Sequence, residues 1–230
     1  MRNAIPLLLS LGALALPASA QNFPWYVGTA FGESKSDAAL VTDREGTIRD
    51  SGQATNVRSS FDDKDSAGKL WVGYRISDIF SVEANYTDLG KTNIETRFNV
   101  PNGFTGSAAG FTDREVKGYG LDFVAQVPLW ERLSLYGKVG LFRSEVKTDV
   151  RLEGDAHFAD NEPSNTRSEK SRESNFKYGL GLQWAFSERW SARLEWERVN
   201  AVGKPATLTS DNPTLQADVD AWWLGVQFRF

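Results

Sequence analysis

The amino-acid sequence predicts an all-β protein, an eight-stranded antiparallel up-and-down transmembrane β-barrel. The first supporting observation is an N-terminal export signal, and the second is a set of eight segments in which apolar and polar residues alternate. The third is the last of these segments, AWWLGVQFRF, which ends on Phe230. Because successive side chains of a strand point to opposite faces, each segment has one apolar face and one small or polar face. Such segments, about ten residues long and separated by turns, are typical of membrane-spanning barrels.

The first twenty residues have the features of a secretory signal peptide. Arg2 supplies one positive charge, residues 5–16 form an apolar run, and Ala18-Ser19-Ala20 is a small-residue cleavage site. The apolar run is shorter than the ~20 residues that a membrane-spanning helix needs. We therefore predict that residues 1–20 are a signal peptide and that residues 21–230 form a single outer-membrane β-barrel domain.

Composition argues against several other classes of protein. The chain carries 26 basic and 30 acidic residues, and loss of Arg2 makes it more acidic still, so we expect no nucleic-acid binding. There is no cysteine, so disulfides do not hold the fold. After residue 20 no run of 18 apolar residues occurs, which argues against a transmembrane helix.

The eight alternating segments are joined by three short and four long, polar connections. An even number of strands is what single-chain bacterial barrels have. Because these barrels have short periplasmic turns and long extracellular loops, we expect both termini on the periplasmic side of a bacterial outer membrane. The predicted strands are 25–34, 68–76, 80–89, 115–127, 133–144, 175–186, 190–200 and 221–230; the predicted turns are Ser77-Asp78, 128–132 and 187–189; the predicted loops are about 35–67, 90–114, 145–174 and 201–217.

The placement of charges decides which face meets lipid. A Lys or Arg that faces lipid at mid-depth costs roughly 2–4 kcal/mol, so the face with charges in mid-strand lines the lumen. An eight-stranded barrel has room only for its own side chains, and buried charges need partners. We predict a packed plug of ion pairs, with a gated ion path as the alternative. The predicted network comprises Lys69, Arg75, Glu83, Asp122, Lys138, Arg193, Glu195 and Arg229.

The apolar face carries charges only near the loop ends of its strands, at Lys117, Arg143 and Arg198. This is the depth of lipopolysaccharide phosphates, which Arg binds in a bidentate manner. We predict a lipopolysaccharide contact there, and interfacial charges without a specific ligand are the alternative. A soluble lipocalin-type barrel would turn its apolar face inward, but aromatic residues gathered near one end of the strands fit an interfacial girdle better.

No residue pattern points to catalysis or to a cofactor. His157, the only histidine, lies in a long polar loop, whereas a hydrolytic site needs a base that its neighbours hold in place. The sequence has no Cys/His metal set and no phosphate-binding glycine motif between a strand and a helix. We expect no enzymatic activity, no cofactor and no bound metal.

Three strings of the sequence carry a family resemblance: GYRISDIFSVEANYTDLGK (73–91), GLDFVAQVPLWERLSLYGKVGLFR (120–143) and YGLGLQWAFSERWSARLEWERV (178–199). They resemble the β-barrel domain of OmpA-like outer-membrane proteins, over the whole mature chain apart from the long loops. The resemblance implies that Phe230 is the C-terminal aromatic signal read by the barrel-assembly machinery. OmpA itself continues into a peptidoglycan-binding domain, whereas this sequence ends with the barrel, so the resemblance does not extend to cell-wall anchoring.

Two classes of function follow from this pattern. The first is a non-enzymatic barrel with a structural, membrane-integrity and surface-interaction role of the adhesion type, whose partners are outer-membrane lipid, lipopolysaccharide and an extracellular molecule bound by the loops. The second is a small pore or uptake channel for ions or small solutes. Loops on a rigid scaffold often carry function, but the mixture of Ser, Asp, Arg and Glu in these loops identifies no partner.

Overall fold

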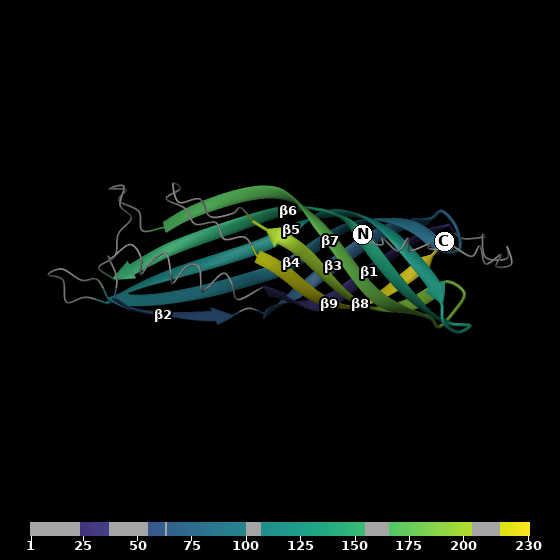
Figure 1. Cartoon of the computed structure of the whole chain (residues 1–230), viewed down its shortest axis with the longest axis horizontal. Coiled ribbons are helices and arrows are strands. Elements are labelled where there is room, and N and C mark those ends of the chain that lie inside the picture. Colours follow the sequence, from purple (N-terminus) through teal and green to yellow (C-terminus); the bar gives the residue numbers. More distant parts are fainter. Residues whose placement is uncertain (1–23, 37–54, 63, 100–106, 155–165, 204–216) are drawn as a thin grey trace, which may run out of the picture.

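The computed structural model of the chain describes residues 24–36, 55–62, 64–99, 107–154, 166–203 and 217–230. Within these ranges nine strands form one antiparallel sheet (Figure 1). No helix in this part of the chain is long and apolar enough to cross a membrane. The strands are β1 (Trp25–Ser36), β2 (Thr55–Asp62), β3 (Lys64–Arg75), β4 (Phe80–Asn99), β5 (Ser107–Pro128), β6 (Leu133–Gly154), β7 (Thr166–Ala185), β8 (Trp190–Val202) and β9 (Ala217–Arg229).

Eight of these strands close into a barrel, which confirms the predicted fold class. The first strand, β1, pairs with β3 on one side and with the last strand, β9, on the other, so that Val27 lies between Val72 and Phe228. Pairing of β4 with β5 completes the ring. Closure pairs the backbone N–H and C=O groups of every barrel strand, which is what a lipid environment requires, because lipid offers no hydrogen-bond partners.

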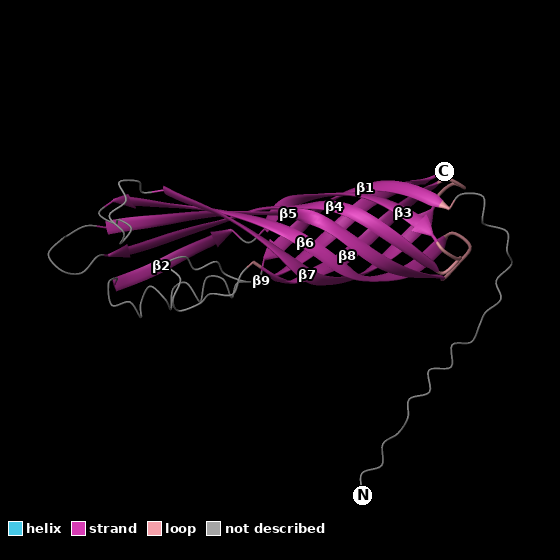
Figure 2. Ribbon diagram, turned by 90° about the horizontal axis from the view of Figure 1, so that it is seen from above, coloured by secondary structure: helices cyan, strands magenta, loops and turns pink. Residues whose placement is uncertain are grey.

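The ninth strand, β2, lies in a region that the alternation assigns to a loop, so the predicted 35–67 loop is corrected. Residues 58–62 of β2 pair with 93–97 of β4, and residues 68–75 of β3 pair with 81–88 of the same strand. Thus β2 extends the β3 side of the sheet beyond the barrel. Figure 2 shows β2 beside the strands that project from one end of the barrel.

Four neighbouring strands are longer than predicted. Strands β4, β5, β6 and β7 have 20, 22, 22 and 20 residues, so most of the predicted loops 90–114 and 145–174 is paired sheet. The predicted 201–217 loop is corrected only at its ends, because β8 continues to Val202 and β9 begins at Ala217. In Figure 2 these long strands project beyond the barrel, at the end opposite to the C-terminus. We call this part, residues 55–62, 91–99, 107–116, 145–154 and 166–174, the extension.

The three short turns lie at the other end, which we call the turn end. Two of them use the same device: the Ser77 hydroxyl accepts a hydrogen bond from the Phe80 N–H at 3.0 Å, and the Ser187 hydroxyl accepts one from the Trp190 N–H at 3.0 Å. A serine that replaces a backbone partner in this way stabilises a tight turn. These are the turns that the sequence predicts at Ser77-Asp78 and 187–189.

The outer surface of the barrel is a continuous apolar belt. Leu224 of β9 and Phe31 of β1, which are neighbours across the seam, are 67% and 76% exposed. Aromatic pairs border the belt. The ring centroids of Trp25 and Tyr74 lie 4.9 Å apart near the turn end, and those of Tyr86 and Tyr119 lie 5.2 Å apart near the extension. A continuous apolar belt between two aromatic borders is the surface that a bilayer covers.

Candidate functional site

Charged side chains fill the middle of the barrel, on the inward positions of six strands. They form a group of six linked ions and a neighbouring pair, Arg193 with Glu83, which together we call the lumen network. Its members are buried, and each comes from a position where the alternation turns the side chain away from lipid. The members are Lys69 of β3, Glu83 of β4, Asp122 of β5, Lys138 of β6, Lys177 of β7, and Arg193, Glu195 and Glu197 of β8.

Lys138 lies at the centre of the lumen network. Its Nζ is 2.6 Å from Oε1 of Glu195 and 3.7 Å from Oδ2 of Asp122, and it also contacts Glu197. Lys69 binds the same two glutamates, at 2.6 Å and 2.9 Å. Tyr136 donates a hydrogen bond to the second oxygen of Glu195 at 2.8 Å. Each glutamate thus neutralises more than one lysine.

The network continues toward the extension through Lys177. Its Nζ lies 3.0 Å from Oδ2 of Asp122 and 3.6 Å from Oε2 of Glu197, and it donates to the Asn85 side-chain oxygen at 2.9 Å. Asn85 in turn donates to Asp122 at 2.8 Å. Lys177 is fully buried, so these contacts replace its hydration.

Toward the turn end the network ends in the pair formed by Arg193 and Glu83. Nη1 of Arg193 lies 2.7 Å from Oε1 of Glu83, and its Nε donates to the Gln183 side-chain oxygen at 3.0 Å. Tyr26 donates to the same glutamate oxygen at 2.8 Å. The guanidinium also lies over the Tyr136 ring, 4.7 Å from its centroid. Arg193 is therefore held from several sides, and it lines the cavities on both sides of it.

Six of the eight residues predicted for the ion-pair network lie in this cluster: Lys69, Glu83, Asp122, Lys138, Arg193 and Glu195. Arg75 and Arg229 do not; both line a cavity at the turn end. Lys177 and Glu197 belong to the network but were not among the predicted residues. Strand alternation places both inward, so the signal for them was present in the sequence.

The lumen network balances its charge. Four cations meet four carboxylates, which removes most of the cost of burying each ion. One cavity beside the network, lined by Lys69, Glu83, Arg193 and Glu195 among others, has a volume of about 10 Å³. That volume holds about one water molecule. The part of the lumen around the network is therefore packed with side chains, and whether it conducts ions stays a prediction.

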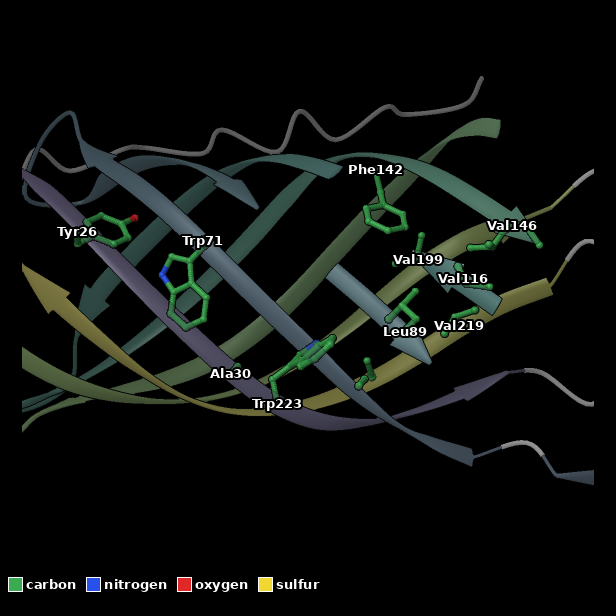
Figure 3. Close-up of a cluster of buried hydrophobic side chains, with 13 residues drawn as sticks. Tyr26, Ala30, Trp71, Leu89, Val116, Phe142, Val146, Val199, Val219 and Trp223 are labelled. Atoms are coloured by element: carbon green, nitrogen blue, oxygen red, sulfur yellow. The ribbon is translucent and has the colours of Figure 1, made fainter. Parts of the chain in front are cut away.

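Buried apolar side chains line the barrel interior (Figure 3), and part of this cluster covers the network on the side of the extension. Phe142, Val199 and Val219 point into the barrel, and each is at most 2% exposed. Arg114 crosses this end and donates to the Val202 carbonyl at 2.7 Å, and its burial lowers the pKa of the guanidinium to about 10. The mouth of the barrel beneath the extension is therefore packed with side chains.

The three residues predicted to contact lipopolysaccharide are differently engaged. Lys117 lies 3.1 Å from Glu115, and Arg198 makes two hydrogen bonds to Asp220, at 2.8 Å and 2.5 Å. Arg143 has no carboxylate partner in the part of the chain described, and donates to the Ser174 hydroxyl at 3.0 Å. Two of the three cations are therefore already paired within the barrel, and Arg143 is the one available to a phosphate.

The extension carries exposed ion pairs on its surface. Arg172 donates to Glu145 at 2.8 Å, and this hydrogen bond lowers the pKa of the glutamate. Lys147 lies 2.7 Å from Asp149, which likewise lowers the pKa of that aspartate. These ion pairs are accessible to solvent, so the surface of the extension stays hydrophilic.

Of the remaining predicted residues, Phe230 can be located. Phe230 donates its backbone N–H to the Trp25 carbonyl at 3.0 Å and stacks on Phe228, with ring centroids 6.4 Å apart. It is 52% exposed, at the aromatic border of the turn end, and its role in assembly stays a prediction. His157 and the signal peptide (1–20) lie outside the described residues.

A closed barrel with an apolar belt and a charged, packed interior defines a transmembrane β-barrel protein of the bacterial outer membrane. The sequence from residue 7 to residue 230 matches the outer membrane protein beta-barrel domain family, and the chain belongs to this family.

Two curated relatives match all of this chain. They are Outer membrane protein A of Escherichia fergusonii and of Shigella dysenteriae, each 23% identical over 239 residues. The match covers 55% of each relative, so this chain spans about half the length of the curated relatives. Among solved structures, Neisserial surface protein A is similar in fold: the TM-score is 0.53 and the identity 12%, over 90% of this chain and 97% of that one.

Proposed function

We propose that this protein is a non-enzymatic surface scaffold of the outer membrane, which holds the extension outside the cell for contact with an extracellular partner. The observation that carries the proposal is the length of β4 to β7, which continue as paired sheet beyond the apolar belt. A barrel that served only as a membrane plug would need no ordered sheet outside the lipid. The first described residue, Pro24, and the last, Phe230, lie at the turn end, so both ends of the described barrel would then face the periplasm.

The orientation can be tested with single cysteines, since the chain has none of its own. Glu153→Cys places a thiol at an exposed position of the extension, and Glu131→Cys places one in the β5–β6 turn. On intact cells a membrane-impermeant maleimide should label the first variant and should label the second only after permeabilisation. Labelling in the opposite order would refute the proposed orientation.

The contact role can be tested by shortening the extension. Replacing residues 147–170 with a short turn removes the outer part of β6 and β7 and leaves the belt residues of both strands intact. The variant should still migrate differently before and after heating on a detergent gel. Adherence of expressing cells to epithelial layers should fall to that of cells without the protein. Unchanged adherence would exclude an adhesive role for this part.

Lipopolysaccharide is the lipid partner we propose, with Arg143 as the main contact and Lys117 and Arg198 in support. Arg offers a planar fork that fits a phosphate, and Arg143 is the member of the three without a carboxylate partner among the described residues. Alanine at all three positions should reduce the lipopolysaccharide that copurifies with the barrel. The same amount of lipopolysaccharide on the triple variant would rule this contact out.

A small pore is the second candidate, and one observation favours it: cavities lie on both sides of Arg193. If Arg193 exchanged partners, these spaces could join. Planar-bilayer recording of the refolded protein distinguishes the two functions. The scaffold proposal expects no steady conductance, whereas conductance that changes in Glu83→Gln or Lys138→Met would support the pore.

A further inference from the structure

The turn end of the barrel contains a cavity with an excess of positive charge. Three arginines from three strands line it: Arg75 of β3, Arg193 of β8 and Arg229 of β9. Asp78 is the one acidic side chain in its lining. We propose that this cavity binds a phosphate group at the mouth of the barrel, independently of the role of the extension.

The arginines of this cavity are incompletely paired. Arg193 is satisfied by Glu83 at 2.7 Å, but Nη2 of Arg75 lies 3.8 Å from Asp78, which is longer than a hydrogen bond. Arg229 has no carboxylate partner within the described ranges, and it is only half-buried. Two guanidinium groups are thus crowded together at a place where the protein supplies little negative charge. An anion would remove their mutual repulsion.

The chemistry of the lining favours phosphate over a simple halide or carboxylate. Each guanidinium presents parallel N–H donors that match two oxygens of a tetrahedral oxyanion, and two such groups from β3 and β9, the strands on either side of β1, can share one phosphate. The amide side chains of Gln126 and Gln183 and the Ser81 hydroxyl also line the cavity. A site of several donors and two incompletely paired cations fits an anion with three or four oxygens.

A further polar atom of the cavity points to a ligand that also donates a hydrogen bond. Oε1 of Gln227 is buried and has no hydrogen-bond partner, and Gln227 lines the same cavity. Leaving a buried acceptor unsatisfied is unfavourable, so a ligand with one donor is preferred. Hydrogen phosphate has its own O–H, and an ethanolamine phospholipid has an ammonium beside its phosphate. The shared chemistry is a phosphate group that carries one donor.

The cavity is small and opens toward the turn end. Its volume is about 10 Å³, which holds about one water molecule and is too small to enclose a phosphate, and the turn residues Ser77, Asp78 and Ile79 line it. A phosphate would therefore lie at the mouth, between Arg75 and Arg229, and would not pass Arg193. Binding at this place would leave the lumen network intact.

The test is phosphate titration of the isotope-labelled, refolded full chain in an uncharged maltoside detergent, followed through the arginine Nε–Hε resonances. Two resonances should shift and saturate, and Arg229→Gln should weaken phosphate binding by at least about tenfold. Arg132→Gln, which removes a guanidinium from a neighbouring turn that does not line the cavity, should bind phosphate like the natural chain. Arg229→Lys, which keeps the charge without the fork, should bind with intermediate affinity.

Further arms separate the anion and its source. Acetate should bind at least about tenfold more weakly than phosphate, because it offers two oxygens and no donor. In nanodiscs that contain phosphatidylethanolamine, weaker binding of added phosphate than in maltoside would identify the lipid head group as the source, and unchanged binding would identify soluble phosphate. Shifts that do not saturate, equal binding of acetate, or equal binding by Arg229→Gln would overturn the proposal. A gel of unheated samples confirms that each variant is folded.

Discussion

Glu197 shows how single residues stabilise this barrel. Its carboxylate lies 2.9 Å from Nζ of Lys69 and 3.6 Å from Nζ of Lys177, and it also contacts Lys138. Removing one partner from a buried ion pair costs more than the pair itself contributes, because the remaining charge stays buried without compensation. One carboxylate that serves three lysines is therefore a sensitive position.

We predict that Glu197→Gln destabilises the folded barrel by about 3–5 kcal/mol. The measurement is urea unfolding of the protein refolded in lipid vesicles. The matched control is Glu153→Gln, which removes an exposed partner 3.0 Å from Arg151 and should change stability by less than about 1 kcal/mol. Combining Glu197→Gln with Lys177→Met should cost less than the sum of the single changes, since the two residues are coupled. Equal effects at positions 197 and 153 would contradict the buried-network interpretation.

At the scale of strands, the apolar belt depends on depth in the membrane. Leu224 of β9 faces outward between Phe31 of β1 and Leu194 of β8, and lies between Trp222 and Phe228 on the same face. No protein side chain covers such a position fully, and lipid fills the space. A charge there has no route to water.

We predict that Leu224→Arg destabilises the barrel by roughly 2–4 kcal/mol, because the guanidinium faces the middle of the bilayer. Leu129→Arg, in the turn after β5, should change the stability by at most about 1 kcal/mol, since that residue lies near the interface. Urea titrations in vesicles compare the two variants. If both changes cost the same, the outer face of β9 is not at mid-depth.

The alternation of the sequence predicts the strands of the belt but not their continuation into the extension. Where one face meets lipid, alternation is strong, as in Leu70, Val72 and Tyr74 of β3. In the extension both faces are largely polar, so the contrast that marks a membrane strand is lost. A weaker signal remained: Val146, Thr148 and Val150 alternate with charged residues, and β-branched side chains favour strands.

The candidate site, too, is predictable only in part. The alternation of side chains along each strand, which we call its parity, shows which charges of the belt strands point inward. The partner of each charge depends on how far its side chain reaches across the lumen. Arg75 and Arg229 have the parity of network residues, but each is the last residue of its strand, at the turn end, and neither is paired with the carboxylates around Lys138. Depth along the barrel, which alternation does not report, decides which charges meet.

At the scale of the whole molecule, stability rests on the seam between the first and last strands. β1 and β9 are separated by most of the chain, and they pair over eleven residues, from Tyr26 with Arg229 to Ser36 with Val219. Until this seam forms, both strands have free edges in a medium that cannot satisfy them. Closure of the seam is therefore the step that makes the sheet compatible with lipid.

Gly32 lies in this seam, where the two backbones approach closely. A Cβ at this position would overlap the carbonyl oxygen of Trp222 and lie 2.9 Å from the ring of Trp223. Gly32→Ala must therefore push β9 away from β1. We expect a loss of about 1–3 kcal/mol and a marked fall in the fraction that migrates as a folded barrel on an unheated detergent gel.

The control for the seam is Gly137→Ala on β6. There a Cβ would meet Leu180 at 3.4 Å, an ordinary contact, so the variant should fold as well as the natural chain. If Gly32→Ala folded equally well, the seam would have to tolerate a displaced β9, and closure would depend on the other pairs along the seam. If both variants failed, added volume anywhere on the sheet would be the cause, and the seam would not be special. Only failure of Gly32→Ala alone is consistent with a barrel whose closure depends on close packing of its first and last strands.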